Sequence, residues 1–260
     1  MTTQILLTGG TGTLGRQLLP LLREAGRKVR VLSRRPGEGA DGVEYVTGDL
    51  TTGAGVDTAV NGVETVVHCA GSAKGDDVKA GNLVRAAAEA GVRHIVYISV
   101  VGADRVPVTS RADRAMFGYY AAKRGGEIAV AESGVPWTTL RATQFHDLVL
   151  LTARQLAKLP VLPVPAGTRV QPVDSGEVAA RLVELAFGAP AGLVPDLGGP
   201  RVYGMDEVIR DYLRAAGKRR PLLPMRMPGK AAAAMRAGAN LTTAGETGHR
   251  TWEEFLAARG

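Results

Sequence analysis

The sequence contains one cysteine, four histidines and few aromatic residues among its 260 positions. A single cysteine excludes an internal disulfide and is typical of a protein kept in a reducing compartment. The scattered histidines and Cys69 have no metal-ligand spacing, so we expect no bound metal.

Long apolar runs are also absent from the sequence. The first apolar run ends at Thr8 and has no basic segment before it, which argues against a secretory signal peptide. No later run approaches the length that a bilayer-spanning helix needs. These features predict a soluble cytoplasmic protein without a membrane partner.

The formal net charge of +7 raises the question of nucleic-acid binding. Apart from residues 34–35 and 218–220, however, the basic residues are spread along the chain. The sequence also lacks a recognised nucleic-acid motif and an aromatic-rich basic stripe. We therefore expect no nucleic-acid partner, and a small anionic ligand explains part of the positive charge more simply.

A glycine-rich loop near the N-terminus organises the rest of the chain. Residues 5–8 form a short apolar run that predicts a buried strand, and residues 16–22 form an amphipathic segment. Between them, Gly9, Gly12 and Gly15 follow one another at three-residue spacing. Glycine lets the backbone approach a pyrophosphate, and the helix N-terminus attracts its charge. The motif predicts dinucleotide binding. The alternative is an ordinary tight turn, which can also be rich in glycine.

Strand and helix patterns alternate along the first 150 residues. Strands are expected at 5–8, 29–32, 43–46, 64–68, 94–99 and 137–141, and helices at 13–25, 76–90, 113–132 and 148–159. This alternation predicts an α/β fold, with a doubly wound parallel sheet (a Rossmann fold) covered by helices on both faces.

The composition changes after residue 159. Prolines crowd residues 160–172, helices are expected at 174–187 and 203–216, and a loop with one strand at 190–200. Residues 221–228 are expected to be irregular, and Thr251 and Glu254 have capping-box spacing. We therefore predict a nucleotide-binding core at 1–150 and a smaller substrate-binding lobe at 151–260, packed into one compact unit.

The residues that end the second expected strand indicate which dinucleotide binds. An acidic residue there would favour NAD(H), but the sequence has Ser33, Arg34 and Arg35 instead. The guanidinium of arginine is well suited to a phosphate, so these residues favour NADP(H) over NAD(H). A solvated basic turn is the alternative.

Tyr119 and Lys123 lie four residues apart on an expected helix, so both project from one face. A nearby ammonium lowers the pKa of a phenol, which suits Tyr119 for exchanging a proton while a nicotinamide exchanges a hydride. Tyrosine and lysine also occur at this spacing by chance. The small residues Cys69, Ala70 and Gly71 would leave room for the ribose and nicotinamide.

In this order, the motifs resemble the short-chain dehydrogenase/reductase superfamily, specifically its atypical, NmrA-like NAD(P)-binding branch. The matching stretches are residues 8–15, residues 48–50, Tyr119-x-x-x-Lys123, residues 140–147 and residues 198–200. They span nearly the whole chain, which makes the resemblance more specific than any single motif.

The resemblance implies a role for each matching residue. The residues that would hold the pyrophosphate are Gly9, Thr11, Gly12, Thr13, Leu14 and Gly15. Ser33 with Arg34 or Arg35 would hold the 2′-phosphate, and Asp49 with Leu50 the adenine. Residues 69–71 would line the nicotinamide ribose, Lys123 would bond its hydroxyls, and Tyr119 would be the proton donor.

The sequence departs from the family pattern at the serine or threonine that holds a substrate carbonyl. Ser99 lies where the first serine of the family sits, and the expected catalytic position falls near Val101, which cannot donate a hydrogen bond. Ser99, Gln144 or His146 would then substitute, or the carbonyl chemistry is weakened. His146 is otherwise structural, and Phe145 either walls the substrate site or packs the smaller lobe.

The sequence as a whole predicts an NADP(H)-dependent oxidoreductase, a monomer or homodimer, that reduces a ketone or quinone on an apolar small molecule. Two alternatives remain open. A non-catalytic protein that senses NADP(H) and regulates a partner is favoured by Val101. A nucleotide-sugar epimerase or dehydratase is disfavoured by the short C-terminal lobe.

Overall fold

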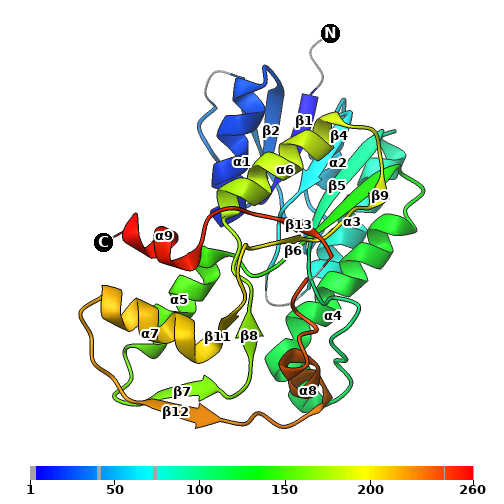
Figure 1. Cartoon of the computed structure of the whole chain (residues 1–260). Coiled ribbons are helices and arrows are strands. Elements are labelled where there is room, and N and C mark those ends of the chain that lie inside the picture. The colour runs from blue at the N-terminus through cyan, green and yellow to red at the C-terminus, as the bar shows by residue number, and fades with distance from the viewer. Residues whose placement is uncertain (1–3, 40–41, 73–74, 243, 260) are drawn as a thin grey trace. The chain divides into compact units, whose positions relative to one another are not determined.

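The computed structural model describes residues 4–39, 42–72, 75–242 and 244–259 (Figure 1). The chain forms two compact units. Unit 1 comprises Met1–Ser99, Ala122–Leu140 and Gly176–Val194, and unit 2 comprises Val100–Ala121, Arg141–Ser175 and Pro195–Gly260. The chain therefore passes between the units several times, whereas the sequence suggested one boundary at residue 150.

Unit 1 is built on a parallel sheet with the strand order β3-β2-β1-β4-β5-β6. Its strands are β1 (Gln4–Thr8), β2 (Lys28–Ser33), β3 (Val43–Thr47), β4 (Thr65–His68), β5 (His94–Val100) and β6 (Trp137–Ala142), with β9 (Gly192–Leu193) paired to β6. The chain runs outward from β1 to β3 and then returns to β4 on the other side of β1. This is the doubly wound order, so the predicted α/β fold is confirmed.

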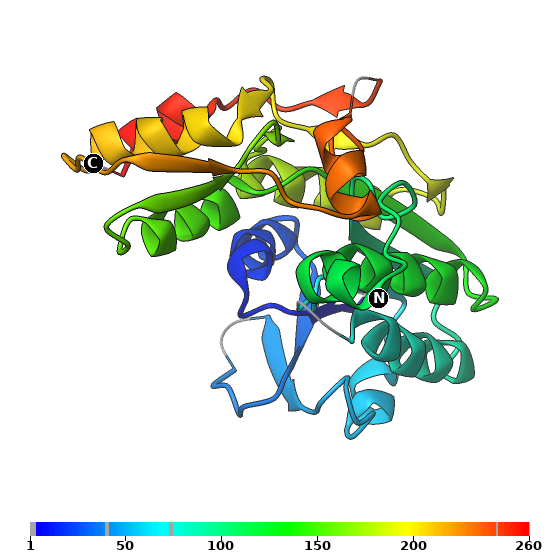
Figure 2. The same cartoon turned by 90° about the horizontal axis from the view of Figure 1, so that it is seen from below.

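Helices cover both faces of the unit 1 sheet, as Figure 2 shows for α1 on one side and α2 and α3 on the other. The helices are α1 (Thr13–Glu24), α2 (Val56–Val60), α3 (Asp76–Glu89), α4 (Arg111–Ala131) from residue 122 onward, and α6 (Ser175–Phe187). Side chains of α2 and α3 pack with Leu6, Val66 and Ile95 of the sheet in one buried core. Burial of this apolar area stabilises the unit and fixes the ends of its strands.

Unit 2 contains the remaining elements. They are α5 (His146–Leu156), α7 (Met205–Ala215), α8 (Lys230–Arg236), α9 (Trp252–Ala257), β7 (Leu162–Pro165), β8 (Arg169–Val170), β10 (Leu197–Gly198), β11 (Tyr203–Gly204), β12 (Leu222–Met225) and β13 (Glu246–Thr247). Helix α7 packs against α5, α9 and β7. The fully buried rings of Tyr203, Trp252 and Phe255 lie in the core of this unit.

Several elements of unit 2 differ from expectation. Residues 221–228 were predicted to be irregular, but β12 pairs in parallel with β7. Pro224 is tolerated there because a two-stranded sheet has only edge strands. The short α8 was not predicted, whereas the capping box of α9 is confirmed by the bond that Glu254 N donates to Thr251 Oγ1.

Among the residues that the structure describes, we find no helix that combines the length and apolar character needed to cross a membrane.

Candidate functional site

The glycine loop forms a cradle that side chains would fill. Gly9 directly follows β1 with a φ of +72°, and a Cβ there would lie 2.7 Å from Ala70 N. A Cβ on Gly15 would collide with the carbonyl oxygen of Gly9, to which Gly12 N donates at 2.9 Å. Helix α1 begins directly after Gly12, so its N-terminal N–H groups face this loop. The loop fits a dinucleotide pyrophosphate, because it combines close backbone approach with the positive end of a helix.

The segment after β4 lies beside the glycine loop. Cys69 N donates to Thr8 O at 3.2 Å, and Ala70 N donates to Thr8 Oγ1 at 3.3 Å. This is the point where the strand order reverses, which is where open α/β sheets bind dinucleotides. Burial raises the pKa of the Cys69 thiol to about 12, so the thiol stays protonated at physiological pH.

The ends of β2 and β3 also meet. Gly48 N donates to Ser33 O at 2.9 Å, and the guanidinium-bearing side chains of Arg34 and Arg35 are exposed. In the loop after β3, the carboxylate of Asp49 accepts a hydrogen bond from Thr51 N at 2.8 Å, and this bond lowers the pKa of Asp49. The two segments expected to contact the adenosine part of the cofactor are therefore adjacent.

Lys123 is buried in unit 1, and its ammonium group has a backbone and a carboxylate partner there. Its Nζ donates to Ile98 O at 3.1 Å and lies 3.1 Å from Asp76 Oδ2. It also lies 5.0 Å from the centre of the Tyr97 ring. Burial by itself lowers the pKa of Lys123, but the interactions with Tyr97 and Asp76 outweigh it and the pKa is raised. Lys123 is therefore a charged group held in an apolar setting.

Two further polar side chains lie in the same unit. The His68 ring stacks on Tyr97 with centroids 5.3 Å apart, and burial followed by the charge of Lys123 lowers its pKa to about 3. His68 is thus neutral and bonded to Thr8 Oγ1 through Nδ1 at 2.7 Å. The Oγ of Ser99 is buried and has no hydrogen-bond partner among the described residues.

Tyr119 lies on α4, one turn before Lys123, in the part of the helix that belongs to unit 2. It is half-buried and its ring meets that of Tyr120 edge-on, with centroids 5.9 Å apart. Burial raises the pKa of Tyr120 to about 12, although a hydrogen bond with Gln144 opposes this. Tyr120 therefore stays protonated within the core of unit 2.

Gln144 and Val101, both expected near the substrate, are engaged inside unit 2. The amide of Gln144 donates to Asn240 O at 3.4 Å and accepts from Gln171 N at 3.3 Å. Val101 is completely buried, and its backbone N donates to Ala142 O at 3.0 Å. Both residues are thus engaged within unit 2, and their expected contact with a substrate stays a prediction.

The surroundings of His146 differ most from those expected of a catalytic residue. Its side chain is fully buried at the start of α5, with the Phe255 ring 4.8 Å and the Trp252 ring 6.0 Å from its own. Burial lowers its pKa to about 4, so the imidazole is neutral at physiological pH. These surroundings are typical of a packing residue, and the catalytic role expected for His146 stays a prediction. Phe145 precedes it, half-buried, and forms a β-bridge with Val173.

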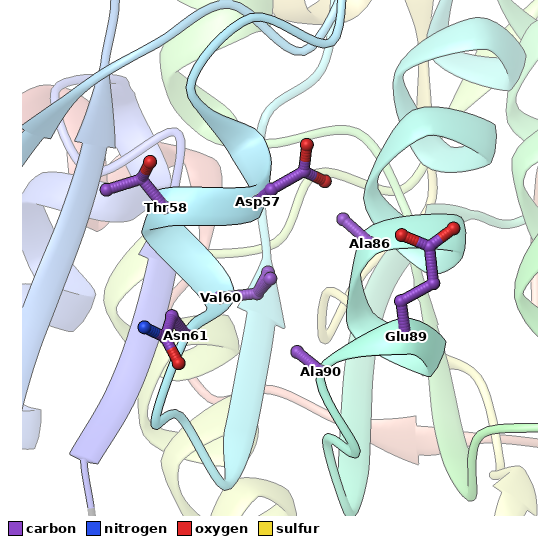
Figure 3. Close-up of a pocket in the computed structure, with 7 residues that line it drawn as sticks. All are labelled: Asp57, Thr58, Val60, Asn61, Ala86, Glu89 and Ala90. Carbon is purple, nitrogen blue, oxygen red and sulfur yellow. The ribbon is translucent and has the colours of Figure 1, made fainter.

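A surface hollow of about 420 Å³ lies between α2 and α3 (Figure 3). Its lining includes the carboxylates of Asp57 and Glu89, which both pair with Arg85. These helix ends precede β4 and β5, so the hollow lies at the amino ends of those strands. Because its lining is acidic and the glycine loop follows the carboxyl end of β1, the hollow is not suited to the phosphates of a dinucleotide.

Asp76 is a candidate site residue that we did not identify from the sequence. It is the first residue of α3, where an acidic residue is common because it complements the helix dipole. The sequence contains no signal that Asp76 faces Lys123, because residues 47 positions apart (123 − 76) meet only through the order of the strands.

Comparison with known proteins agrees with this geometry. The sequence model of the NAD(P)H-binding family matches residues 9–185. The chain is 33% identical over 219 residues to a (4-alkanoyl-5-oxo-2,5-dihydrofuran-3-yl)methyl phosphate reductase of Streptomyces griseus, covering 82% of this chain and 74% of that protein. It is 34% identical over 243 residues to a ceramide reductase of Caulobacter vibrioides, covering 86% and 74%.

Among solved structures, the fold is similar to that of an NADPH-dependent quinone oxidoreductase from Escherichia coli in complex with NADPH. The TM-score is 0.81 with 19% identity, and the match covers 98% of this chain and 99% of the other. The chain therefore belongs to the NAD(P)H-binding family, in the atypical, NmrA-like class of short-chain dehydrogenases/reductases, which are NAD(P)H-dependent oxidoreductases.

Proposed function

We propose that this protein uses NADPH to reduce a carbonyl group, in a ketone or a quinone, on an apolar small molecule. The observation that carries the proposal is the buried, charged Lys123 beside Gly71, one helical turn after Tyr119. A buried charge is costly unless it has partners, and such groups concentrate at functional sites. The reductase names of the two sequence relatives support reduction as the reaction.

Bound NADPH would supply the hydride, which adds to the carbonyl carbon. The electron pair of the C=O bond then moves to the oxygen, and the phenol of Tyr119 would donate a proton there. The positive charge of Lys123 favours the resulting phenolate, and solvent returns the proton. For a quinone, solvent could protonate the oxygen directly, so that Tyr119 would contribute less.

Ser99 is our candidate for the hydroxyl that holds the carbonyl oxygen. Its buried Oγ has no partner among the described residues, whereas the Gln144 amide is engaged by the chain. The ring nitrogens of His146 also have no partner among those residues, but this ring lies among the rings of Trp252 and Phe255 in the core of unit 2. An unpaired buried hydroxyl is costly, which supports a ligand that completes its hydrogen bonds.

The preference for NADPH follows from the turn after β2. Arg34 and Arg35 are exposed in this turn and can bind a 2′-phosphate. Neither position carries the acidic residue that would bind the hydroxyls of an unphosphorylated ribose. The apolar character of the substrate is supported by the name of one sequence relative, a ceramide reductase.

The test is NADPH consumption with a panel of quinones and of aromatic and aliphatic ketones. We expect turnover of at least one ketone, a loss of at least tenfold in kcat in Tyr119→Phe, and a similar loss in Ser99→Ala. The control is Thr152→Ala, an exposed position on α5 that should leave kcat unchanged. Tight NADPH binding without turnover of any substrate would contradict the proposal.

That result would favour the second candidate, a non-catalytic protein that senses the NADP(H) pool. The observation in its favour is Val101, which supplies no hydrogen-bond donor where active members carry serine or threonine.

A further inference from the structure

The Lys123 ammonium is held by a carboxylate that the sequence motif does not contain. Asp76 and Lys123 are 1% and 3% exposed, and their Oδ2 and Nζ atoms are 3.1 Å apart. A charge pair this deeply buried is sensitive to the loss of either partner, because the remaining charge is then uncompensated.

The same carboxylate also binds the chain segment that follows Gly71. Asp76 Oδ1 accepts a hydrogen bond from Ser72 N at 2.8 Å and lies 3.4 Å from Lys79 Nζ, which itself bonds Ser72 Oγ. A Cβ on Gly71 would lie 3.2 Å from both Asp76 Oδ2 and Lys123 Nζ. The carboxylate therefore joins Lys123 to the backbone after β4, beside the glycine loop.

We propose that Asp76 is a positioning residue for the cofactor site. It keeps the Lys123 ammonium directed at the place of the nicotinamide ribose and fixes the segment 69–72 that would line that ribose. This inference rests on the proposed function for the role of Lys123, but it concerns binding of the cofactor and not reduction of a substrate.

Other groups also face Lys123 and must be considered in any pH test. They are Tyr97 on β5, His68 on β4 and Cys69 after β4. Lys79 on α3 also lies near the carboxylate, and the charge of Asp76 raises the pKa of His68. Because the pKa of His68 is about 3, this imidazole is neutral above pH 7 with or without Asp76, so the comparison between pH 7 and 11 does not depend on it.

The experiment measures the Kd of NADPH between pH 7 and 11, by the change in NADPH fluorescence, for Asp76→Asn and for the control Asp77→Asn. Asp77 is the exposed neighbour in the same first turn of α3, so the control removes the same charge near the same helix end. Asparagine still accepts the bond from Ser72 N. At neutral pH we expect Asp76→Asn to raise the Kd about 10- to 100-fold and Asp77→Asn to change it less than twofold.

The pH profile separates positioning from a general loss of structure. The alkaline weakening of NADPH binding should start at a pH lower by about 1–3 in Asp76→Asn, and should vanish in Lys123→Met. The inference is overturned if Asp76→Asn binds NADPH with the Kd and the pH profile of Asp77→Asn. Because binding is measured without a substrate, a failure of the proposed reduction would be seen separately, as binding without turnover.

If Asp76→Asn does not fold, the double variant Asp76→Asn/Lys123→Met decides the question. We expect the double variant to fold and to unfold cooperatively in urea, because no buried charge is left unpaired. A double variant that is unfolded like Asp76→Asn would contradict the proposed pairing of Asp76 with Lys123.

Discussion

Two buried, titratable side chains drew attention in the sequence, and their surroundings differ completely. Lys123 in unit 1 lies against a carboxylate, a backbone carbonyl and the face of a tyrosine ring. His146 in unit 2 lies against the rings of Trp252 and Phe255. The first environment retains a charge and the second removes it, as the raised pKa of Lys123 and the lowered pKa of His146 show. Charged residues also lie near His146, but only Lys123 has a direct ion pair, and this contact distinguishes the two environments.

The largest expected effect is on the free energy of unfolding of unit 2, when a ring that packs against His146 is removed. Trp252→Ala removes a fully buried ring whose indole N–H donates to Val208 O at 3.3 Å. We expect the free energy of unfolding of unit 2 to fall by about 3–5 kcal/mol, because a large cavity is left in the core. Urea unfolding followed by circular dichroism measures this. Leu151→Ala, at an exposed position of the same unit, should cost less than about 1 kcal/mol, and equal losses would refute the packing role.

A smaller effect is expected in unit 1, on recognition and not on stability. Arg34→Ala should raise the Kd of NADPH about tenfold and leave the Kd of NADH nearly unchanged, because it removes one charge-assisted contact to the 2′-phosphate. Calorimetric titration with both cofactors measures this preference. The matched control is Arg93→Ala, also exposed and just before β5. A parallel weakening of both cofactors would mean that the basic turn is merely solvated.

The last effect is confined to acidic pH and concerns the charge state of His146. Its pKa is about 4 in the folded protein and near 6.5 when unfolded, so the ring adds no pH dependence above pH 6.5. As the pH falls from 6.5 towards 4, the unfolded chain takes up a proton that the folded chain does not, and stability is lost. His146→Phe should therefore unfold less steeply with acid, by up to about 1.4 kcal/mol per pH unit.

The matched comparison for this prediction is wild type at each pH, since His68 has a similarly lowered pKa and remains in the variant. The acid sensitivity is thus reduced and not abolished. An unchanged slope of the free energy of unfolding between pH 4 and 6.5 would show that His146 does not titrate as its surroundings indicate.

Local patterns predicted most of unit 1. The glycine loop and the strands of the sheet follow from glycine spacing and apolar periodicity, which act over a few residues. The alternation of strands and helices then predicted the α/β fold class, but not the order of the strands in the sheet. In unit 2, β12 was missed because its proline-rich segment acquires a strand conformation by pairing with β7.

The chemical surroundings of the candidate site were less predictable. The pairing of Asp76 with Lys123 depends on the order in which strands enter the sheet, which no local pattern encodes. His146 follows a strand end, a place that suits catalytic residues, and its ring contacts come from α9, more than 100 residues later. Tertiary contacts of this kind decide whether a polar residue binds a ligand or packs a core.

The most direct test of this contrast is calorimetric titration of NADPH into Lys123→Met and His146→Phe, under conditions in which both variants are folded. We predict that Lys123→Met weakens binding at least tenfold, whereas His146→Phe stays within twofold of wild type. Unchanged binding in Lys123→Met, or a comparable loss in His146→Phe, would contradict the assignment of the charged group in unit 1 to the cofactor and of the neutral imidazole in unit 2 to packing.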